Sequence, residues 1–167
     1  MQNTIMQCLQ LVGSGNDRRA LSQLLEPVVG ELNTQAVASA GLVIKAGAST
    51  LAKTGASAFY ASVGGRLLTI AAATDMPALT GLVITANSFN VACFFVNSSG
   101  TVSVRFGTEG VALGRVKFPD FPLGQALVGF LIITHSSTFT GGTTALDTAT
   151  TVYVSPTGAF DPTILFS

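Results

Sequence analysis

The single histidine of the chain, His135, is the residue type best suited to acid–base chemistry. A serine hydrolase needs a histidine base, a carboxylate that orients it and a nucleophilic serine, for which Asp147 and either Ser136 or Ser137 are the candidates. No GxSxG elbow accompanies them, and a lone histidine after a buried strand is more often a polar strand end. We therefore expect no catalytic residue and predict that the protein is not an enzyme.

Residues 47–54, with the sequence GASTLAKT, come close to a phosphate-binding P-loop. The P-loop pattern has a second glycine directly before its lysine, whereas Ala52 stands at that position. A P-loop also leads into a helix, but Gly55 and the small residues after it indicate a turn into a strand. We interpret the segment as a surface loop of small residues, and we expect no cofactor.

The two cysteines carry neither a metal-site nor a disulfide signature. Cys8 and Cys93 lie far apart, without CxxC or Cys/His spacing. One histidine and scattered carboxylates give no zinc-ligand spacing, so no metal site is predicted. Cys93 is interpreted as a core hydrophobe.

The chain is unusually poor in charge. Among 167 residues there are eight basic and eight acidic side chains, so 10% are charged and the formal net charge is zero; an average domain has about 25% charged residues. Without a basic surface we expect no nucleic-acid binding. The longest apolar run, residues 126–133, is far shorter than the roughly 18 residues of a membrane span, and no leader is recognised, so no membrane association is expected. Such a surface is expected to pack against copies or partners.

The spacing of apolar residues divides the chain into an N-terminal helical arm, residues 1–35, and a β domain, residues 36–167. Ile5, Leu9 and Val12 recur at helical spacing, and a second helical stripe follows the glycines at 13–15. Pro27 is expected to end or kink the second helical piece before Val28. We predict that one face of this piece contacts another subunit, through Leu21, Leu24, Leu25 and Val28.

The β domain shows short β runs separated by glycine. Nine short strands predict a mainly β fold, an antiparallel sandwich or barrel. Residues 91–96 and 127–133 are apolar at consecutive positions, which predicts central strands covered on both faces. Two hairpins are predicted, at Gly64–Gly65 and at Asn97–Gly100. The predicted strands are 42–45, 59–63, 66–71, 82–85, 89–96, 101–106, 115–118, 126–134 and 150–154.

The aromatic content favours cores and interfaces over ligand stacking. The chain has eleven phenylalanines, two tyrosines and no tryptophan, whereas glycan and base platforms favour tyrosine and tryptophan. An apolar segment follows Asp161 and Pro162, and we expect it to pack onto the core or onto a neighbour. Its predicted inter-subunit contacts are Ile164, Leu165 and Phe166.

Several phrases between Leu42 and Pro162 carry a resemblance to a family. They are LVIKAG, TIAAATDMPAL, FNVACFFVNSSGTV, KFPDFPLGQALVGFLII, FTGGTTALD and VYVSPTGAFDP. With these phrases the chain resembles small virion-associated structural proteins of tailed bacteriophages, of the capsid decoration or cement type. The resemblance spans about three quarters of the chain and leaves out the segment before Asn33.

The resemblance implies a structural role on the capsid surface of a virion that is assembled in the host cytoplasm. The expected partners are the major capsid protein and further copies of this chain, as a homotrimer. The alternative is a receptor-binding or fibre-tip module that presents loops Gly107–Gly114 and Ser136–Thr144 to a host surface glycan. The scarcity of aromatic residues in those loops argues against this alternative.

Overall fold

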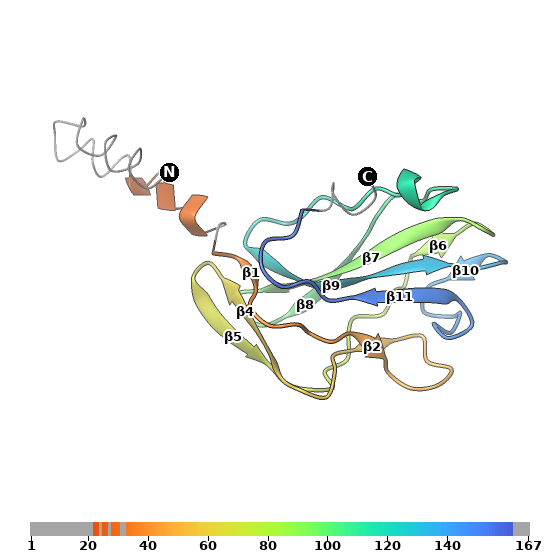
Figure 1. Cartoon of the computed structure of the whole chain (residues 1–167), viewed down its shortest axis with the longest axis horizontal. Coiled ribbons are helices and arrows are strands. Elements are labelled where there is room, and N and C mark those ends of the chain that lie inside the picture. The colour runs from red at the N-terminus through yellow and green to blue at the C-terminus, as the bar shows by residue number, and fades with distance from the viewer. Residues whose placement is uncertain (1–21, 24, 27, 31–32, 162–167) are drawn as a thin grey trace.

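The structure, a computed structural model, describes residues 22–23, 25–26, 28–30 and 33–161. Strands dominate these residues, and they form several small sheets; Figure 1 shows β4 and β5 apart from the longer strands β7, β9 and β11. The predicted mainly β, antiparallel fold is confirmed. The strands are β1 (Gln35–Ala36), β2 (Val43–Ile44), β3 (Ala52–Lys53), β4 (Phe59–Val63), β5 (Arg66–Ile70), β6 (Val83–Ile84), β7 (Phe89–Asn97), β8 (Val102–Phe106), β9 (Gln125–Thr134), β10 (Phe139–Thr140) and β11 (Thr150–Val154).

A four-stranded antiparallel sheet in the order β11–β9–β7–β8 forms the centre of the fold. β7 and β9 pair along nearly their whole length, with one register shift between Phe94 and Phe95. Seven of the nine residues of β7 and seven of the ten residues of β9 are buried, and the others are half-buried. The prediction that these two apolar runs are central strands covered on both faces is therefore confirmed.

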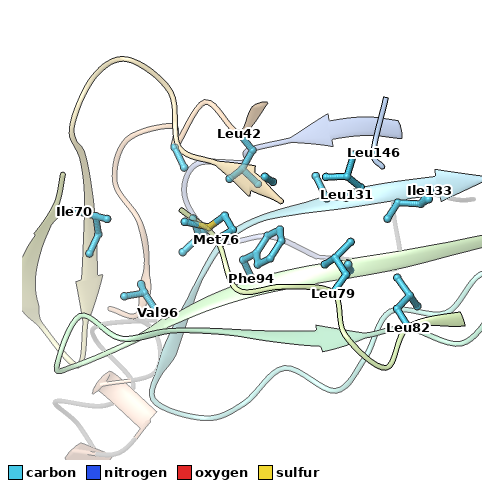
Figure 2. Packing of buried hydrophobic residues seen from close by; sticks show 14 of the residues in the cluster. Leu42, Ile70, Met76, Leu79, Leu82, Phe94, Val96, Leu131, Ile133 and Leu146 are labelled. Atoms are coloured by element: carbon cyan, nitrogen blue, oxygen red, sulfur yellow. The ribbon is translucent and has the colours of Figure 1, made fainter. Parts of the chain in front are cut away.

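One face of this sheet packs against the larger hydrophobic cluster. Three smaller sheets, β1–β4–β5, β10–β6 and β2–β3, and their connections lie on the other side of that cluster. Figure 2 shows Phe94 of β7 and Leu131 of β9 packed among Leu42, Met76 and Leu79. The two layers enclose a core as in a β-sandwich, because each sheet must bury its apolar face against another element.

The opposite face of the central sheet is covered by connecting segments rather than by a second sheet. Phe118 and Phe121, in the connection before β9, and Phe160, after β11, pack on Phe95 and Phe130. Ring centroids are 5.2 Å apart for Phe95 and Phe121 and 5.1 Å apart for Phe118 and Phe130, in edge-to-face geometry. This phenylalanine cluster explains the aromatic bias of the sequence, because rings packed edge to face fill a core without polar groups.

Both predicted hairpins are present. Gly64 and Gly65 join β4 to β5 and have φ angles of 58° and 80°. A tight two-residue hairpin requires positive φ at both positions, which glycine adopts easily. β7 and β8 are joined by residues 98–101, where the Asn97 side-chain oxygen accepts hydrogen bonds from the amides of Ser99 and Thr101, both at 3.0 Å. The Asn97–Ser98–Ser99 sequence therefore serves as a turn.

One predicted strand is wrong and three strands were not predicted. Residues 115–118 form no strand, because a 3-10 helix covers Leu113–Arg115 and only Lys117 makes an isolated bridge, to Thr108. β1, β3 and β10 have two residues each, too few to produce an alternating pattern in the sequence.

Some described residues of the predicted arm are helical, whereas Asn33 and Thr34 are not and Gln35 begins β1. Residues 22–23, 25–26 and 28–30 have helical backbone, so helical residues are described on both sides of Pro27. Pro27 itself lies outside the described residues, and its predicted end or kink stays a prediction. The helical form of the rest of the arm, and the boundary at residue 35 between arm and domain, stay predictions.

Candidate functional site

His135 follows β9 and stabilises its own turn. Its Nδ1 lies 2.9 Å from Ser137 Oγ and accepts a hydrogen bond from the Ser137 amide at 3.1 Å. The Asp147 carboxylate, predicted as the orienting group, accepts instead from the Ala48 amide at 2.7 Å. The structure therefore brings His135 and Ser137 together but ties Asp147 to the β2–β3 loop, while Ser136 is exposed beside them. Because Asp147 accepts from the Ala48 amide rather than from the imidazole, the arrangement lacks the geometry of a base held by that carboxylate.

The P-loop-like segment forms part of a β-hairpin. Val43 pairs with Lys53 and Ile44 pairs with Ala52, so a strand stands where a P-loop has its helix. Phosphate binding by a P-loop depends on amide groups at a helix N-terminus. The interpretation as a surface loop fits residues 47–51, but it is wrong for residues 52–54, because Ala52 and Lys53 form β3 and Ala52 and Thr54 are buried.

Within the described part of the chain, no three histidine, cysteine, aspartate or glutamate side chains come close enough to hold a metal ion. Cys93 is completely buried, and this burial raises the pKa of its thiol far above the ordinary value. A thiol kept neutral is a poor nucleophile, as expected of a core residue. Among the helical residues that can be described, none belongs to a segment long and apolar enough to cross a membrane.

Two of the seven predicted interface residues can be located. Leu25 is half-buried and lines a groove of about 390 Å³, together with Val29 and Gly64 of the β4–β5 turn. Val28 is 54% exposed. The other five lie outside the described residues: Leu21, Leu24, Ile164, Leu165 and Phe166.

Thr34 joins the helical residues to the β domain. Its hydroxyl donates to the Gly30 carbonyl at 2.8 Å and accepts from the Gly64 amide at 2.9 Å. One side chain thereby satisfies a carbonyl at the end of the helical segment and an amide of the β4–β5 turn. The exposed Val29 lies near this junction, because it lines the same groove as Gly64 of the β4–β5 turn.

The outward side of the β1–β4–β5 sheet is free of charge and partly apolar. Cross-strand pairing puts Tyr60 opposite Thr69 and Ser62 opposite Leu67, and the Val37 amide donates to the Tyr60 carbonyl. Tyr60 is 43% exposed, Val37 54% and Leu67 62%, while the residues between them are buried in the core. We call this surface the outer face; its residues are Gln35, Val37, Tyr60, Ser62, Leu67 and Thr69.

Sequence reasoning missed the outer face. The alternation in β4, with Phe59, Ala61 and Val63 buried, predicts that Tyr60 and Ser62 face the other way. That Leu67 shares this side follows only from the strand register, which the tight glycine turn sets. A register argument from the hairpin would have found the surface.

Comparison with known proteins adds no relative. The chain matches no protein-family model, no curated protein and no solved structure.

Proposed function

We propose that the protein is a structural component of a bacteriophage virion, a head decoration or cement protein that binds the capsid shell and stabilises it through inter-subunit contacts. The observation that carries this proposal is the outer face, an exposed sheet surface with three large apolar or aromatic side chains and no charge. Exposed apolar surface of this kind is typical of a site covered by another protein.

The helical segment adds exposed apolar side chains near the β4–β5 turn. Val28 and Val29 are 54% and 48% exposed, and the Thr34 contacts hold the end of their segment against the β4–β5 turn. A sheet face and a helix that both present valine or leucine to solvent offer two connected areas for a neighbouring subunit. Contacts repeated over many copies in a shell gain avidity, so each can be modest.

Binding only to the assembled shell would stabilise it by mass action. The hydroxyl and aliphatic side chains of the outer face suit contacts with a capsid protein, because they pack without requiring an oppositely charged partner. The resemblance of the segment from Leu42 to Pro162 to virion proteins supports a phage setting, with the major capsid protein as partner and a homotrimer as the form of self-association.

The alternative, a glycan-binding receptor module, has less support. In the loop Ser136–Thr144 the aromatic side chain is Phe139, which is completely buried. In the loop Gly107–Gly114 the large exposed side chains are Val111 and Leu113. Neither loop presents the exposed aromatic ring on which sugars commonly stack.

The experiment uses shells of the cognate major capsid protein assembled without this protein. It measures whether the purified protein co-sediments with these shells and whether it raises their melting temperature. Leu67→Lys and Tyr60→Lys place charge on the outer face and are expected to weaken binding at least tenfold without unfolding the protein. Val152→Lys, at a 51% exposed valine of β11 in another sheet, is the matched control and should bind as the wild type does.

Two results would overturn the proposal. One is a wild-type protein that does not bind or stabilise shells at any tested salt concentration. The other is binding to particular sugars on a glycan array that alanine substitutions in Gly107–Gly114 or Ser136–Thr144 abolish, which would favour the receptor module.

A further inference from the structure

The strand β8 is an open edge of the central sheet. In the described part of the chain, β8 is the last strand of the order β11–β9–β7–β8, and nothing that the structure describes pairs with its far side as a strand. An exposed strand edge presents unpaired N–H and C=O groups that another strand can bind.

The hydrogen bonds on either side of β8 show which backbone groups point outward. Asn97 donates to Thr101, and Gly107 donates to Val91, so the odd-numbered residues of β8 bond to β7. In an antiparallel pair every second residue bonds to the neighbour, and the residues between them direct their backbone groups away. The outward groups of β8 are therefore those of Val102, Val104 and Phe106.

The chain itself shows that this edge accepts a partner. Thr108, the next outward residue, exchanges two hydrogen bonds with Lys117, at 2.9 Å and 3.2 Å, in an antiparallel bridge. Lys117 thus occupies the first position of a missing strand, and no strand in the described part of the chain pairs with the three outward positions beside it along β8. An incoming strand of five residues, roughly 17 Å long, would fill them.

Side chains beside the edge define the chemistry of the partner. An open groove of about 650 Å³ adjoins it, whose charged residues are Arg105, Lys117 and Asp120. Arg105 Nη1 donates to the Asp120 carbonyl at 3.4 Å, which leaves other guanidinium N–H groups for a partner carboxylate. Two positive charges and one negative leave the groove with a net charge of +1. On the other side of β8, Val102, Val104 and Phe106 pack against the larger cluster while staying half-exposed.

We infer that the β8 edge and the groove bind an extended acidic segment of a partner protein by strand addition. Side chains of the segment alternate: apolar residues lie beside Val102, Val104 and Phe106, and an acidic residue lies beside Arg105. Backbone hydrogen bonds supply affinity and the alternating contacts supply selectivity, as in other strand-addition complexes.

A second copy of the chain fits this edge poorly. In twofold pairing centred on Val104, the β7–β8 turn of the second copy would fall opposite Thr108, where Lys117 already lies. The β8 edge belongs to the central sheet, whereas the outer face belongs to the β1–β4–β5 sheet. Peptide binding at β8 and shell binding through the outer face are therefore independent claims, and either can fail without the other.

The test uses an acetylated, amidated peptide of sequence Val-Asp-Val-Thr-Val, which in antiparallel pairing puts aspartate opposite Arg105. Amide hydrogen exchange of the wild-type protein at saturating peptide should show new protection at Val102, Val104 and Phe106. Arg105→Gln should weaken binding about tenfold, the loss expected for one charged hydrogen bond. Arg66→Gln, at an exposed arginine of the edge strand β5, is the matched control and should bind within twofold of the wild type.

A second probe keeps the test independent of protein variants. The same peptide with an N-methylated central valine lacks the amide that pairs with Val104, so its binding to the wild type should be abolished. Equal binding of the methylated peptide, or protection at amides elsewhere, would overturn the inference. If the three β8 amides become more protected as the protein concentration rises without peptide, the inference is also overturned, because a second copy of the chain then binds the edge.

Discussion

Phe94 and Phe95 are consecutive residues of β7 and both are completely buried, yet they belong to two different hydrophobic clusters. Phe94 points into the core between the sheets, and Phe95 points into the phenylalanine cluster beneath the loops. The central sheet therefore has no solvent-facing side at this position, and both of its faces contribute to stability.

Phe95→Ala is expected to destabilise the protein as strongly as Phe94→Ala, by about 3–5 kcal/mol, because each removes a fully buried ring and leaves a cavity. Urea unfolding followed by circular dichroism measures both. Leu123→Ala, at an 83% exposed leucine of the covering loop, is the control and should change stability by less than about 0.5 kcal/mol. A cost for Phe95→Ala close to that of the control would show that the loops only rest loosely on the sheet.

Gly129→Ala is expected to destabilise the protein by about 2 kcal/mol through overpacking. Gly129 lies opposite Phe94 in the register, and a Cβ there would meet the Val154 carbonyl oxygen at 2.5 Å and Leu42 Cδ1 at 2.7 Å. The same measurement on Gly47→Ala provides the control, because no atom lies within 4 Å of a Cβ at that loop position. A gain in stability for Gly129→Ala would contradict the close approach of β11 to β9.

Local sequence signals predicted the elements that local forces determine. Residues close in the sequence determine the strands β7 and β9 and the turn at Gly64–Gly65. Each of these was found at its predicted place. Contacts made by distant residues could not be predicted in this way. β1 depends on pairing with β4, and Lys117 depends on Thr108, so neither has a periodic pattern of its own.

The candidate surfaces follow the same division. Exposure of Tyr60 follows from alternation along one strand, whereas the joining of Tyr60, Leu67 and Val37 into one surface needs the register of three strands. The open edge of β8 is a property of the strand order, which single-sequence patterns do not fix.

Glu109 is expected to contribute to stability at neutral pH and to lose that contribution in acid. The Thr85 amide donates to its carboxylate at 2.9 Å, and this hydrogen bond holds the pKa of Glu109 below its ordinary value. A lowered pKa means that the contribution is complete above the unfolded-state value of roughly 4.3 and disappears as the pH falls through the lower native-state value.

Urea midpoints of the wild type and Glu109→Gln at pH 7 and pH 3 measure this effect. The variant should be less stable at pH 7, by under about 1 kcal/mol because the group is largely exposed, and the difference should be smaller at pH 3. Glu26→Gln, at an exposed glutamate of the helical segment, serves as the control. A difference between wild type and Glu109→Gln that is equal at both pH values would contradict the role of the charged carboxylate.

Cys93 is expected to be unreactive in the native protein and reactive once the protein unfolds. Cys93 lies on β7 between β8 and β9, and its side chain is completely buried on the face of the phenylalanine cluster. Burial keeps a reagent from reaching the sulfur. It also raises the pKa of the thiol, so the reactive thiolate does not form. In a Cys8→Ser background, labelling with a disulfide reagent at pH 8 should be slowed on the order of 10³-fold or more relative to the protein in denaturant, because reaction requires unfolding of the central sheet. Labelling of Cys8 in a Cys93→Ser variant gives the background rate of the other thiol. Fast native-state labelling of Cys93 would mean that the loops carrying Phe118 and Phe121 open without unfolding of the sheet, and that the second cluster is a mobile cover.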